Sequence, residues 1–447
     1  MPLFTRRASL LAGVGLSVFA LTAPALAVPQ YSLQTTIAIP SAASNTAGTF
    51  VGYDLSTFDT TSQLFYLTDR SNNGIDVFSS KTNSFVSRIG AGLFAGATPI
   101  NDNAGPNGIS ITTQSDNTRL LIAGNGPSNF LTFTLASDGL TTIGAARTTS
   151  TVIVAVPPAP ATPIPPNRVD GVAYSPTANT ILAANNAANP GFITLVDNKT
   201  GSVIRQVLLN GGANPGAPVG SPANYPDVTG NGVEATVFNT ARGTFFVAVP
   251  TLTTAGTDAG GVIEIDAKTG VLLHTYDFGA LGYTIAGGCA PTGVAQGAGA
   301  SMLVACGNAP SATILLDPTG TGAIKIIPQV GGGDQTSYDS TRKVFFEAAR
   351  YQPSGAVLGI FDGTTGAFSQ AVPTSFNDHS VAADSVSGEV FVPFGASTTA
   401  HPNLVCPLGC IAVFAQTPVP EPASLPLMAL ALGAVGFLVR TRRSPSR

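Results

Sequence analysis

Several residue types are scarce in this chain of 447 residues, and each scarcity bears on a class of function. The chain has no tryptophan, so the usual stacking platform for sugar rings is missing, although nine tyrosines remain. It has only five lysines and a net charge of −4, which leaves no basic face for a phosphate backbone. We therefore expect no nucleic-acid partner. Nucleophile-elbow, P-loop, zinc-protease and haem motifs are also absent, so no motif predicts a cofactor or a reaction.

Long helical periodicity is missing too, whereas turn-forming residues are abundant. The chain has 50 glycines and 34 prolines, and only 10% of its residues are charged. Val, Ile, Thr and Phe cluster in short runs that are separated by Gly, Asn, Asp, Ser and Thr. Such runs are typical of many short strands. We therefore expect an all-β fold for the central part of the chain.

A repeated unit organises this central part. Residues 170–208 read as strand, tight turn, strand, loop, strand, tight turn, strand, and residues 234–276 repeat the pattern. With the hydrophobic residue before the first turn as a register mark, seven copies occur, 43 to 64 residues apart. The seven marks are Phe58, Ile111, Tyr174, Phe238, Ala295, Tyr338 and Ala383. Seven units of four strands predict a seven-bladed β-propeller.

The two ends of the repeat predict how the ring closes. The seventh unit has candidate strands at Ser380–Ala383, Glu389–Pro393 and Ile411–Phe414, but a fourth strand is missing. Tyr31–Ile39 reads as a strand that has no unit of its own. We expect this N-terminal strand to complete the seventh blade, which removes exposed strand edges. The propeller would then occupy residues 28–416.

This pattern of repeats resembles bacterial propellers of the YVTN and lactonase-like type. The resemblance covers about residues 31–416 and is architectural, because the YVTN tetrad itself does not occur in the chain. It implies a seven-bladed ring and, by analogy with metal-dependent lactonases, an ion held near the axis.

The connections between the candidate strands are unequal in length. Turns that join first to second strands, and third to fourth strands, are short, whereas the long segments are of the other two kinds. In a propeller both long kinds emerge on one face, around the mouth of the axial channel. Function usually lies on variable loops that a rigid frame holds. Neutral drift of loop length is the alternative.

The third-to-fourth turns have a common sequence. In four units the third strand ends in Asp and is followed by a turn rich in Thr and Gly: Asp197, Asp266, Asp317 and Asp362. An Asp side chain can accept backbone N–H bonds, and Gly supplies a positive φ. We interpret these residues as turn residues.

One position, four residues before each register mark, is polar in six of the seven copies. It reads Asp54, Asn107, Asp170, Glu234, Pro291, Asp334 and His379. Each residue starts an innermost strand, so we expect a ring around the channel. Four carboxylates that face a narrow channel repel one another unless they are protonated or bind a cation. The ring suits Ca²⁺ or another divalent cation; the alternative is a ring of solvated strand starts.

The four cysteines are candidates for two disulfides. Cys289 and Cys306 flank a predicted hairpin and lie symmetrically about its turn, and Cys406 and Cys410 would close a tight loop. Disulfides are typical of exported chains. Metal binding is the alternative, although no matching His or Cys pair lies nearby.

The N-terminus predicts export. Residues 1–7 are short and basic, residues 8–23 are apolar, and residues 25–27 form a small-residue cleavage site. We therefore expect a signal peptide with a helix over residues 1–27, cleaved between Ala27 and Val28. Residues 5–11 loosely resemble a twin-arginine signal, so the Sec and twin-arginine routes both stay open.

The C-terminal residues 417–447 read as a sorting tail. Residues 422–439 contain no charge and can form a helix of roughly 27 Å, close to the thickness of a bilayer core. An arginine cluster follows at residues 440–447, which predicts a cytoplasmic C-terminus. A plain membrane anchor is the alternative interpretation.

Pro420, Glu421 and Pro422, together with the helix and the arginines, closely resemble the PEP-CTERM sorting signal. The resemblance implies an exosortase-type processing enzyme and an intermediate anchored in the inner membrane. It also implies transfer to the surface or extracellular matrix of a Gram-negative bacterium that makes exopolysaccharide.

These observations favour a binding role. We expect an exported scaffold that presents a loop-rich face to exopolysaccharide, an envelope protein or an ion. The alternatives are a metal-dependent lactonase-like hydrolase, with the ion in the channel as Lewis acid, and a structural spacer.

Overall fold

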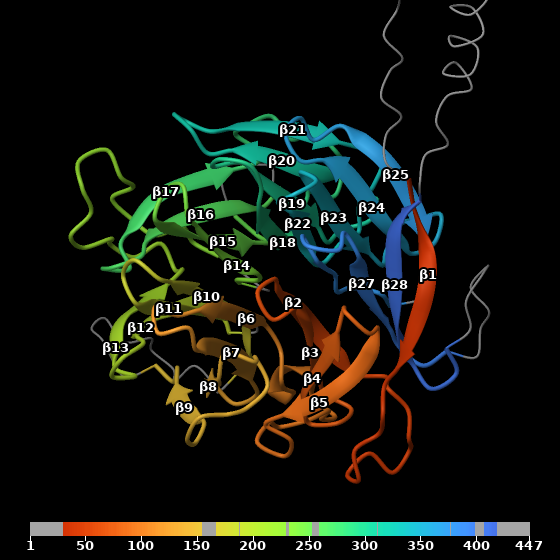
Figure 1. The fold of residues 1–447 in the computed structure, drawn as a ribbon. Helices are drawn as coiled ribbons and strands as arrows, with labels where there is room; N and C mark the ends of the chain where they lie inside the picture. Colours follow the sequence, from red (N-terminus) through yellow and green to blue (C-terminus); the bar gives the residue numbers. More distant parts are fainter. Residues whose placement is uncertain are drawn as a thin grey trace, which may run out of the picture. The chain divides into compact units, whose positions relative to one another are not determined.

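Seven four-stranded antiparallel sheets stand around a common axis in the computed structural model (Figure 1). The structure describes residues 30–153, 167–186, 188–228, 232–252, 259–310, 312–375, 377–397 and 406–417. The predicted seven-bladed β-propeller is therefore confirmed. Within these ranges the chain is almost entirely strand, turn and loop, with one short 3₁₀ helix, η1 (Asn101–Asn103).

The strands of each blade follow one another from the axis outwards. The first three blades are β2 (Tyr53–Asp59), β3 (Leu64–Asp69), β4 (Gly74–Ser79), β5 (Ser84–Ile89); β6 (Ile109–Thr113), β7 (Arg119–Asn125), β8 (Asn129–Leu135), β9 (Arg147–Ser150); and β10 (Val169–Ser175), β11 (Thr180–Asn185), β12 (Phe192–Asp197), β13 (Val203–Leu208). The next two are β14 (Thr236–Asn239), β15 (Thr244–Val249), β16 (Gly261–Asp266), β17 (Leu272–Asp277); and β18 (Pro291–Gln296), β19 (Met302–Cys306), β20 (Thr313–Asp317), β21 (Ala323–Ile327). The last two are β22 (Thr336–Asp339), β23 (Val344–Ala349), β24 (Val357–Asp362), β25 (Phe368–Pro373); and β26 (Ala382–Ala383), β27 (Val390–Phe394), β28 (Cys410–Thr417), β1 (Gln30–Ala38).

The ring closes through its innermost strands. Each first strand contacts the first strand of the next blade, from β2 through β6, β10, β14, β18 and β22 to β26, and β26 contacts β2 again. The blades therefore form a closed ring, in which the sheet edges nearest the axis are the seven first strands.

The N-terminal strand completes the seventh blade, as predicted. β1 pairs with β28 in antiparallel register from Gln30 opposite Thr417 to Ala38 opposite Cys410. Tyr31 of β1 is buried, and its ring packs edge-on against Phe346 of the sixth blade, with the ring centroids 5.1 Å apart. β1 therefore completes the seventh blade and also contacts the sixth blade.

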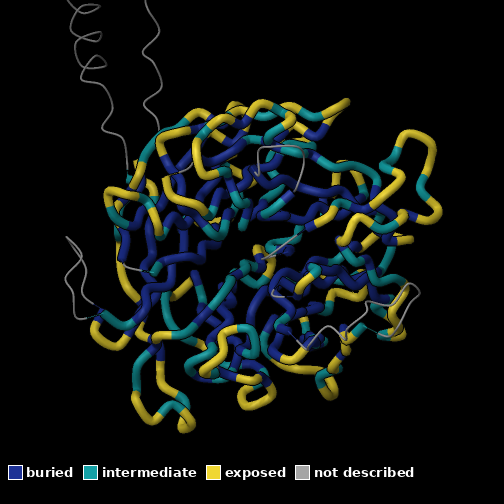
Figure 2. Tube along the Cα trace, turned by 180° about the vertical axis from the view of Figure 1, so that it is seen from behind, coloured by how far each residue is buried: buried dark blue, intermediate teal, exposed yellow. Residues whose placement is uncertain are grey.

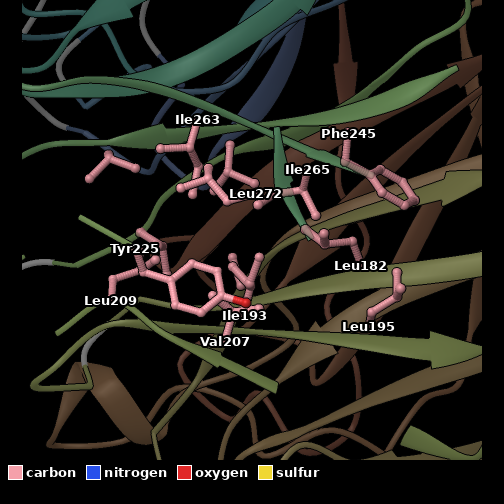
Figure 3. Packing of buried hydrophobic residues seen from close by; sticks show 14 of the residues in the cluster. Leu182, Ile193, Leu195, Val207, Leu209, Tyr225, Phe245, Ile263, Ile265 and Leu272 are labelled. Carbon is pink, nitrogen blue, oxygen red and sulfur yellow. The ribbon is translucent and has the colours of Figure 1, made fainter. Parts of the chain in front are cut away.

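The core lies between the blades. The second and third strands of most blades are buried along nearly their whole length, because both faces of these strands pack against neighbouring blades. In Figure 2 the buried stretches fill the interior of the ring, and the exposed turns lie at its periphery. Figure 3 shows one such cluster, in which Leu182 and Ile193 pack against Phe245 and Ile263. Truncating a buried Phe such as Phe245 to Ala typically costs about 3–5 kcal/mol.

The predicted Asp turns are confirmed. Asp197 Oδ1 accepts hydrogen bonds from the backbone N–H (2.7 Å) and the hydroxyl (2.9 Å) of Thr200. Gly201 follows with φ = 74°, a conformation that favours glycine. Asp266 and Asp362 repeat the pattern, and Asp317 accepts from the N–H of Thr319 at 3.0 Å.

Both predicted disulfides are present. One joins Cys289 to Cys306 across the start of the fifth blade, and the other joins Cys406 to Cys410 before β28. No free cysteine remains in the described ranges.

The ring has two faces that differ in their connections. First-to-second turns such as residues 60–63 and third-to-fourth turns such as residues 80–83 lie on one face, which we call the short-turn face. Second-to-third connections, such as residues 70–73, and fourth-to-first connections, such as residues 90–108, lie on the other, the long-loop face. Residues 136–146, which join β8 to β9, are a long exception on the short-turn face. Gln30 and Thr417 replace a third-to-fourth turn, so both lie on the short-turn face.

The predicted signal helix over residues 1–27 and the predicted helix over residues 422–439 lie outside the described residues. Within the described ranges, no helix is long and apolar enough to span a membrane.

Candidate functional site

A cavity of about 340 Å³ opens on the axis at the long-loop face. Five of the six polar residues that the sequence predicted for the ring lie in its wall: Asp54, Asp170, Glu234, Asp334 and His379. We call this cavity the charged cavity. Asn107 does not line it. It is fully buried just behind the wall, where its Nδ2 donates to the backbone oxygens of Ala104 and Val169. In the fifth blade Thr292, the residue after Pro291, reaches the wall instead.

Two glycines bring neighbouring first strands close together at this level. Gly108 and Gly171 each follow a ring position directly. A Cβ on Gly108 would lie 1.6 Å from the carbonyl oxygen of Asp170, and a Cβ on Gly171 would lie 2.5 Å from that of Glu234. The carboxyl groups therefore converge because these two residues have no side chain.

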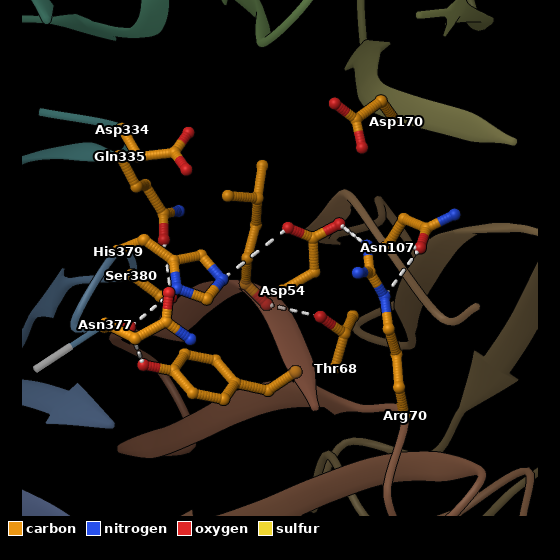
Figure 4. Close-up of polar contacts among 12 residues, drawn as sticks. Asp54, Thr68, Arg70, Asn107, Asp170, Asp334, Gln335, Asn377, His379 and Ser380 are labelled. Atoms are coloured by element: carbon orange, nitrogen blue, oxygen red, sulfur yellow. Dashed lines mark hydrogen bonds and ion pairs between the residues drawn. The ribbon is translucent and has the colours of Figure 1, made fainter. Parts of the chain in front are cut away.

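Three arginines that the sequence pattern did not single out complete the wall: Arg70, Arg168 and Arg350. Arg70 donates to Asp54 and, from Nε at 3.0 Å and Nη2 at 2.7 Å, to Asn107 Oδ1. Arg168 Nε lies 3.0 Å from Asp170 Oδ1. Figure 4 shows Arg70 next to both of its partners, with Asp170 and Asp334 across the cavity.

The third pair joins Arg350 and Asp334, with Nη2 2.9 Å from Oδ2. The guanidinium of Arg350 also lies over the ring of Tyr351, 4.7 Å from its centroid. Its Nε is buried and has no hydrogen-bond partner among the described residues.

The sequence contains a regular spacing that relates two of these arginines to the ring residues. The start of a first strand lies opposite the end of the second strand, as Tyr53 does opposite Asp69. A residue there can therefore pair with one that follows the second strand. Three pairs share a separation of sixteen residues: Asp54 with Arg70, Asp170 with Asn186, and Asp334 with Arg350.

His379 is held firmly in the wall. Its ring stacks on Tyr53, with the centroids 4.3 Å apart, and Tyr53 stacks on Phe50 at 4.7 Å. Nδ1 lies 2.8 Å from the carbonyl oxygen of Asn377, so Nδ1 carries the proton and donates it there. Burial and the nearby Arg350 lower the pKa of His379 to about 3, so the imidazole is neutral at pH 7. Nε2 lies 3.9 Å from Asp54 Oδ1.

The carboxyl groups have pKa values that differ widely. Burial raises the pKa of Asp54 to about 7 in spite of Arg70. The pKa of Asp170 is instead lowered to about 2. Its burial acts in the opposite direction, but Arg168 and a hydrogen bond with Glu234 outweigh this effect. Burial and the charge of Asp170 raise the pKa of Glu234 well above its usual value. Burial raises the pKa of Asp334 as well, against the effect of Arg350.

The predicted divalent-cation site does not fit this arrangement. The sequence pattern shows four carboxylates that need protonation or a cation, but it does not show the guanidinium groups that supply positive charge from within the protein. In the described part of the chain no group of three or more His, Cys, Asp or Glu side chains is placed to hold a metal ion. A cation in the cavity would meet three arginines.

A second hollow of about 510 Å³ occupies the other end of the axis, at the short-turn face. We call it the uncharged mouth, because no charged side chain is among its lining residues. All seven register marks, from Phe58 to Ala383, line it. Gln335 lies at its inner end, where Oε1 accepts from Ser380 Oγ (2.7 Å) and Nε2 donates to the carbonyl oxygen of Ser56 (2.6 Å). These bonds tie three blades together between the two hollows.

Comparisons with known proteins give the context of both parts of the chain. The model of the PEP-CTERM protein-sorting motif matches residues 418–443, which include Pro420, Glu421 and Pro422. No curated protein sequence matches the chain.

Solved structures resemble the propeller. A chain of the mitotic checkpoint complex aligns over 92% of this chain and 99% of its own length, with a TM-score of 0.54 and 10% identity. The streptogramin B lyase structure aligns over 87% of this chain and 98% of its own, with a TM-score of 0.51 and 11% identity. At these identities the likeness shows the fold alone. The chain is thus a seven-bladed β-propeller that carries a PEP-CTERM protein-sorting motif at its C-terminus.

Proposed function

We propose that this protein is an exported, surface-sorted binding scaffold that holds a small polar ligand in its charged cavity. The observation that carries this proposal is the set of ion pairs on the cavity wall, between Arg70 and Asp54, Arg168 and Asp170, and Arg350 and Asp334. Desolvated ion pairs often stabilise a fold less than apolar residues of similar volume would. Their concentration around one cavity, with shifted pKa values, supports a role in binding.

The position of the cavity supports the same role. It opens at the long-loop face, where the fourth-to-first connections supply part of its wall, including Asn101 and Asn377. Both described ends of the propeller, Gln30 and Thr417, lie on the short-turn face. The described ends of the propeller therefore lie away from the entrance of the cavity.

Export and sorting follow from the terminal segments. The PEP-CTERM motif supports processing by an exosortase-type enzyme, after signal cleavage between Ala27 and Val28. We further propose an intermediate held in the inner membrane by residues 422–439, and final placement at the surface or in the matrix of a Gram-negative bacterium. The two disulfides are compatible with an oxidising compartment.

The alternative, a metal-dependent lactonase-like hydrolase, lacks a supporting observation. Its Lewis acid needs a set of oxygen and nitrogen ligands, and each aspartate of the ring instead has a guanidinium partner. Binding therefore explains the wall better than metal-assisted hydrolysis does.

A thermal-unfolding screen of the full-length protein in detergent tests the binding proposal. The panel contains sugars, amino acids, organic acids, phosphate and divalent cations. We expect one chemical class to raise Tm, because a ligand at 100 times its Kd stabilises the folded state by about 2.7 kcal/mol. The variant Asp334→Asn should lose the increase and Ser340→Ala, on the short-turn face, should keep it. A panel in which nothing raises Tm would count against the proposal.

Sorting is tested separately with Glu421→Ala. We expect this variant to accumulate in the inner-membrane fraction, whereas the surface variant Asp116→Ala should be released like the wild type. Unchanged release of Glu421→Ala would contradict exosortase processing.

A further inference from the structure

The wall of the charged cavity alternates hydrogen-bond donors with acceptors. Each of Arg70, Arg168 and Arg350 lies beside an aspartate of the ring. His379 adds a neutral imidazole, and its Nε2, which carries no proton when Nδ1 donates to Asn377, is an acceptor. A ligand in this cavity therefore meets a donor beside an acceptor at the first, third and sixth blades.

The charges on the wall nearly cancel. Three guanidinium groups face the carboxyl groups of Asp54, Asp170, Glu234 and Asp334. Burial and the charge of Asp170 raise the pKa of Glu234 well above its usual value, which favours the protonated form of this group. The three guanidinium groups are therefore matched by the three aspartates that pair with them.

This combination selects one class of ligand. A simple carboxylate only accepts hydrogen bonds, and both a carboxylate and a phosphate carry negative charge that would face the carboxylates of the wall. An ammonium group only donates and would face the arginines. A hydroxyl group both donates and accepts, and it has no charge to be repelled. Several adjacent hydroxyl groups match the alternating wall best.

We propose that the charged cavity binds a single terminal sugar residue of a glycan, a proposal that rests on the binding function proposed above. A volume of about 340 Å³ is at the small end of the range for ligand pockets. It holds one small unit and not a run of several.

The inner end of the cavity favours the terminal residue of a glycan over an internal one. The charged cavity and the uncharged mouth are separate hollows, and Gln335 lies between them, bonded to Ser56 and Ser380 of two other blades. Val381 N–H also donates to Gln335 Oε1, at 3.1 Å. Because the two hollows are separate, the ligand enters from the long-loop face and stops at the inner end of the cavity.

Recognition in this cavity depends on hydrogen bonds more than on ring stacking. The chain has no tryptophan, and the ring of Tyr53 is covered on its two faces by Phe50 and His379. We therefore expect weak binding of a free monosaccharide and a strong dependence on the polar groups of the wall.

Saturation-transfer difference NMR on the full-length protein, in a detergent without a sugar headgroup, tests the proposal. The probes are glucose, galactose, mannose and N-acetylglucosamine, then maltotriose in free and reduced form, with acetate and lysine as controls. We expect signal from at least one sugar and none from acetate or lysine. If the terminal residue of a chain is bound, signal from the oligosaccharide should be confined to one end.

Two variants locate the binding. Asp334→Asn keeps the shape of the side chain and should reduce the sugar signal at least fivefold, whereas Ser340→Ala should leave it unchanged. Thermal unfolding of both variants checks that they are folded. Sugar signal that persists in folded Asp334→Asn would overturn the assignment to the charged cavity.

The outcomes separate the two proposals. If acetate, lysine or another class from the thermal screen binds and its binding is lost in Asp334→Asn, the binding function stands and the sugar assignment is wrong. If no probe of any class binds the wild-type protein, both proposals fail.

Discussion

The two ends of the axial channel are built by the same seven first strands, yet they differ completely in charge. Three arginines and four carboxyl groups line the cavity at the long-loop face. The mouth at the short-turn face is lined by apolar, hydroxyl and amide side chains alone. Along β2 only a few residues separate the two environments, since Asp54 belongs to one and Phe58 to the other.

The hairpin formed by the first two strands explains the difference. At the long-loop end, the start of the first strand faces the end of the second, so side chains from both project beside the axis and can pair. At the short-turn end, the carboxylates are used within the turns. Asp59 accepts from the N–H of Thr61 at 3.1 Å, and Asp339 from that of Thr341 at 2.9 Å. At the short-turn end, the carboxylates are therefore bound within the turns. At the long-loop end, the pairing of the first two strands places charged side chains beside the axis.

The largest effect is expected when an ion pair of the charged cavity is broken. Arg70→Leu leaves Asp54 and Asn107 without their guanidinium partner, and removing one partner of a buried pair costs roughly 3–5 kcal/mol. Urea unfolding measures the loss. Arg205→Leu, on the outer strand β13, should lose less than about 1 kcal/mol; an equal loss in both variants would contradict a special role for the cavity.

A carboxyl group away from both ends sharpens the comparison, because it has no arginine partner among the residues that the structure describes. Glu347 of β23 is fully buried, and burial raises its pKa from 4.5 to about 8. The unfolded chain releases this proton first, so stability falls as pH rises from about 4.5 to about 8. Glu347→Gln should be more stable than the wild type at pH 8, by an amount on the order of 4 kcal/mol, and nearly equal at pH 4.

Unfolding at both pH values measures this difference. The matched variant Asp116→Asn, at an exposed turn, should show no gain at pH 8. A Glu347→Gln variant that is no more stable than the wild type at pH 8 would show that the carboxyl group has a partner in solution.

A smaller effect is expected from the glycine that lets the first strands approach. Gly108→Ala would place a methyl group 1.6 Å from the carbonyl oxygen of Asp170, so the strand must move. Overpacking of this kind costs roughly 1–3 kcal/mol, and ligand binding should weaken because Asp170 shifts. Gly395→Ala, where the nearest atom lies 3.8 Å away, is the control for urea unfolding. Equal stability of the two variants would contradict the close approach.

The smallest effect is expected at the uncharged mouth. Ser337→Ala removes the hydroxyl that accepts from the N–H of Ala383 at 3.1 Å, a loss of about 1 kcal/mol. The affinity of the charged cavity for its ligand should not change, and titration of the ligand measures this affinity. A change in binding would mean that the two ends of the channel are coupled.

Much of the fold could be predicted from the chain. The repeated unit, the Asp turns and the pairing of the unpartnered N-terminal strand with the incomplete seventh unit rely on local patterns, and all three are confirmed. Both disulfides followed from their positions about a hairpin and a tight loop. The boundaries moved by one to three residues, as at β1, which runs from Gln30 to Ala38, and at β28, which runs from Cys410 to Thr417.

The candidate site was only half predictable. The four carboxyl groups of the ring share one position in their repeats, so counting from the register marks found them. Arg168 lies two residues before Asp170, whereas Arg70 and Arg350 follow second strands. Only the strand register connects Arg70 and Arg350 to the axis, and the missing positive charge then suggested a cation.

The sequence by itself determined the number of blades, the turns, the closing strand and the sorting motif, because each depends on residues that are close in the chain or repeat at a regular interval. Only the tertiary structure decided the charge of the channel. Closing the ring brings side chains from several blades within hydrogen-bonding distance, and their mutual burial then sets which carboxyl groups ionise.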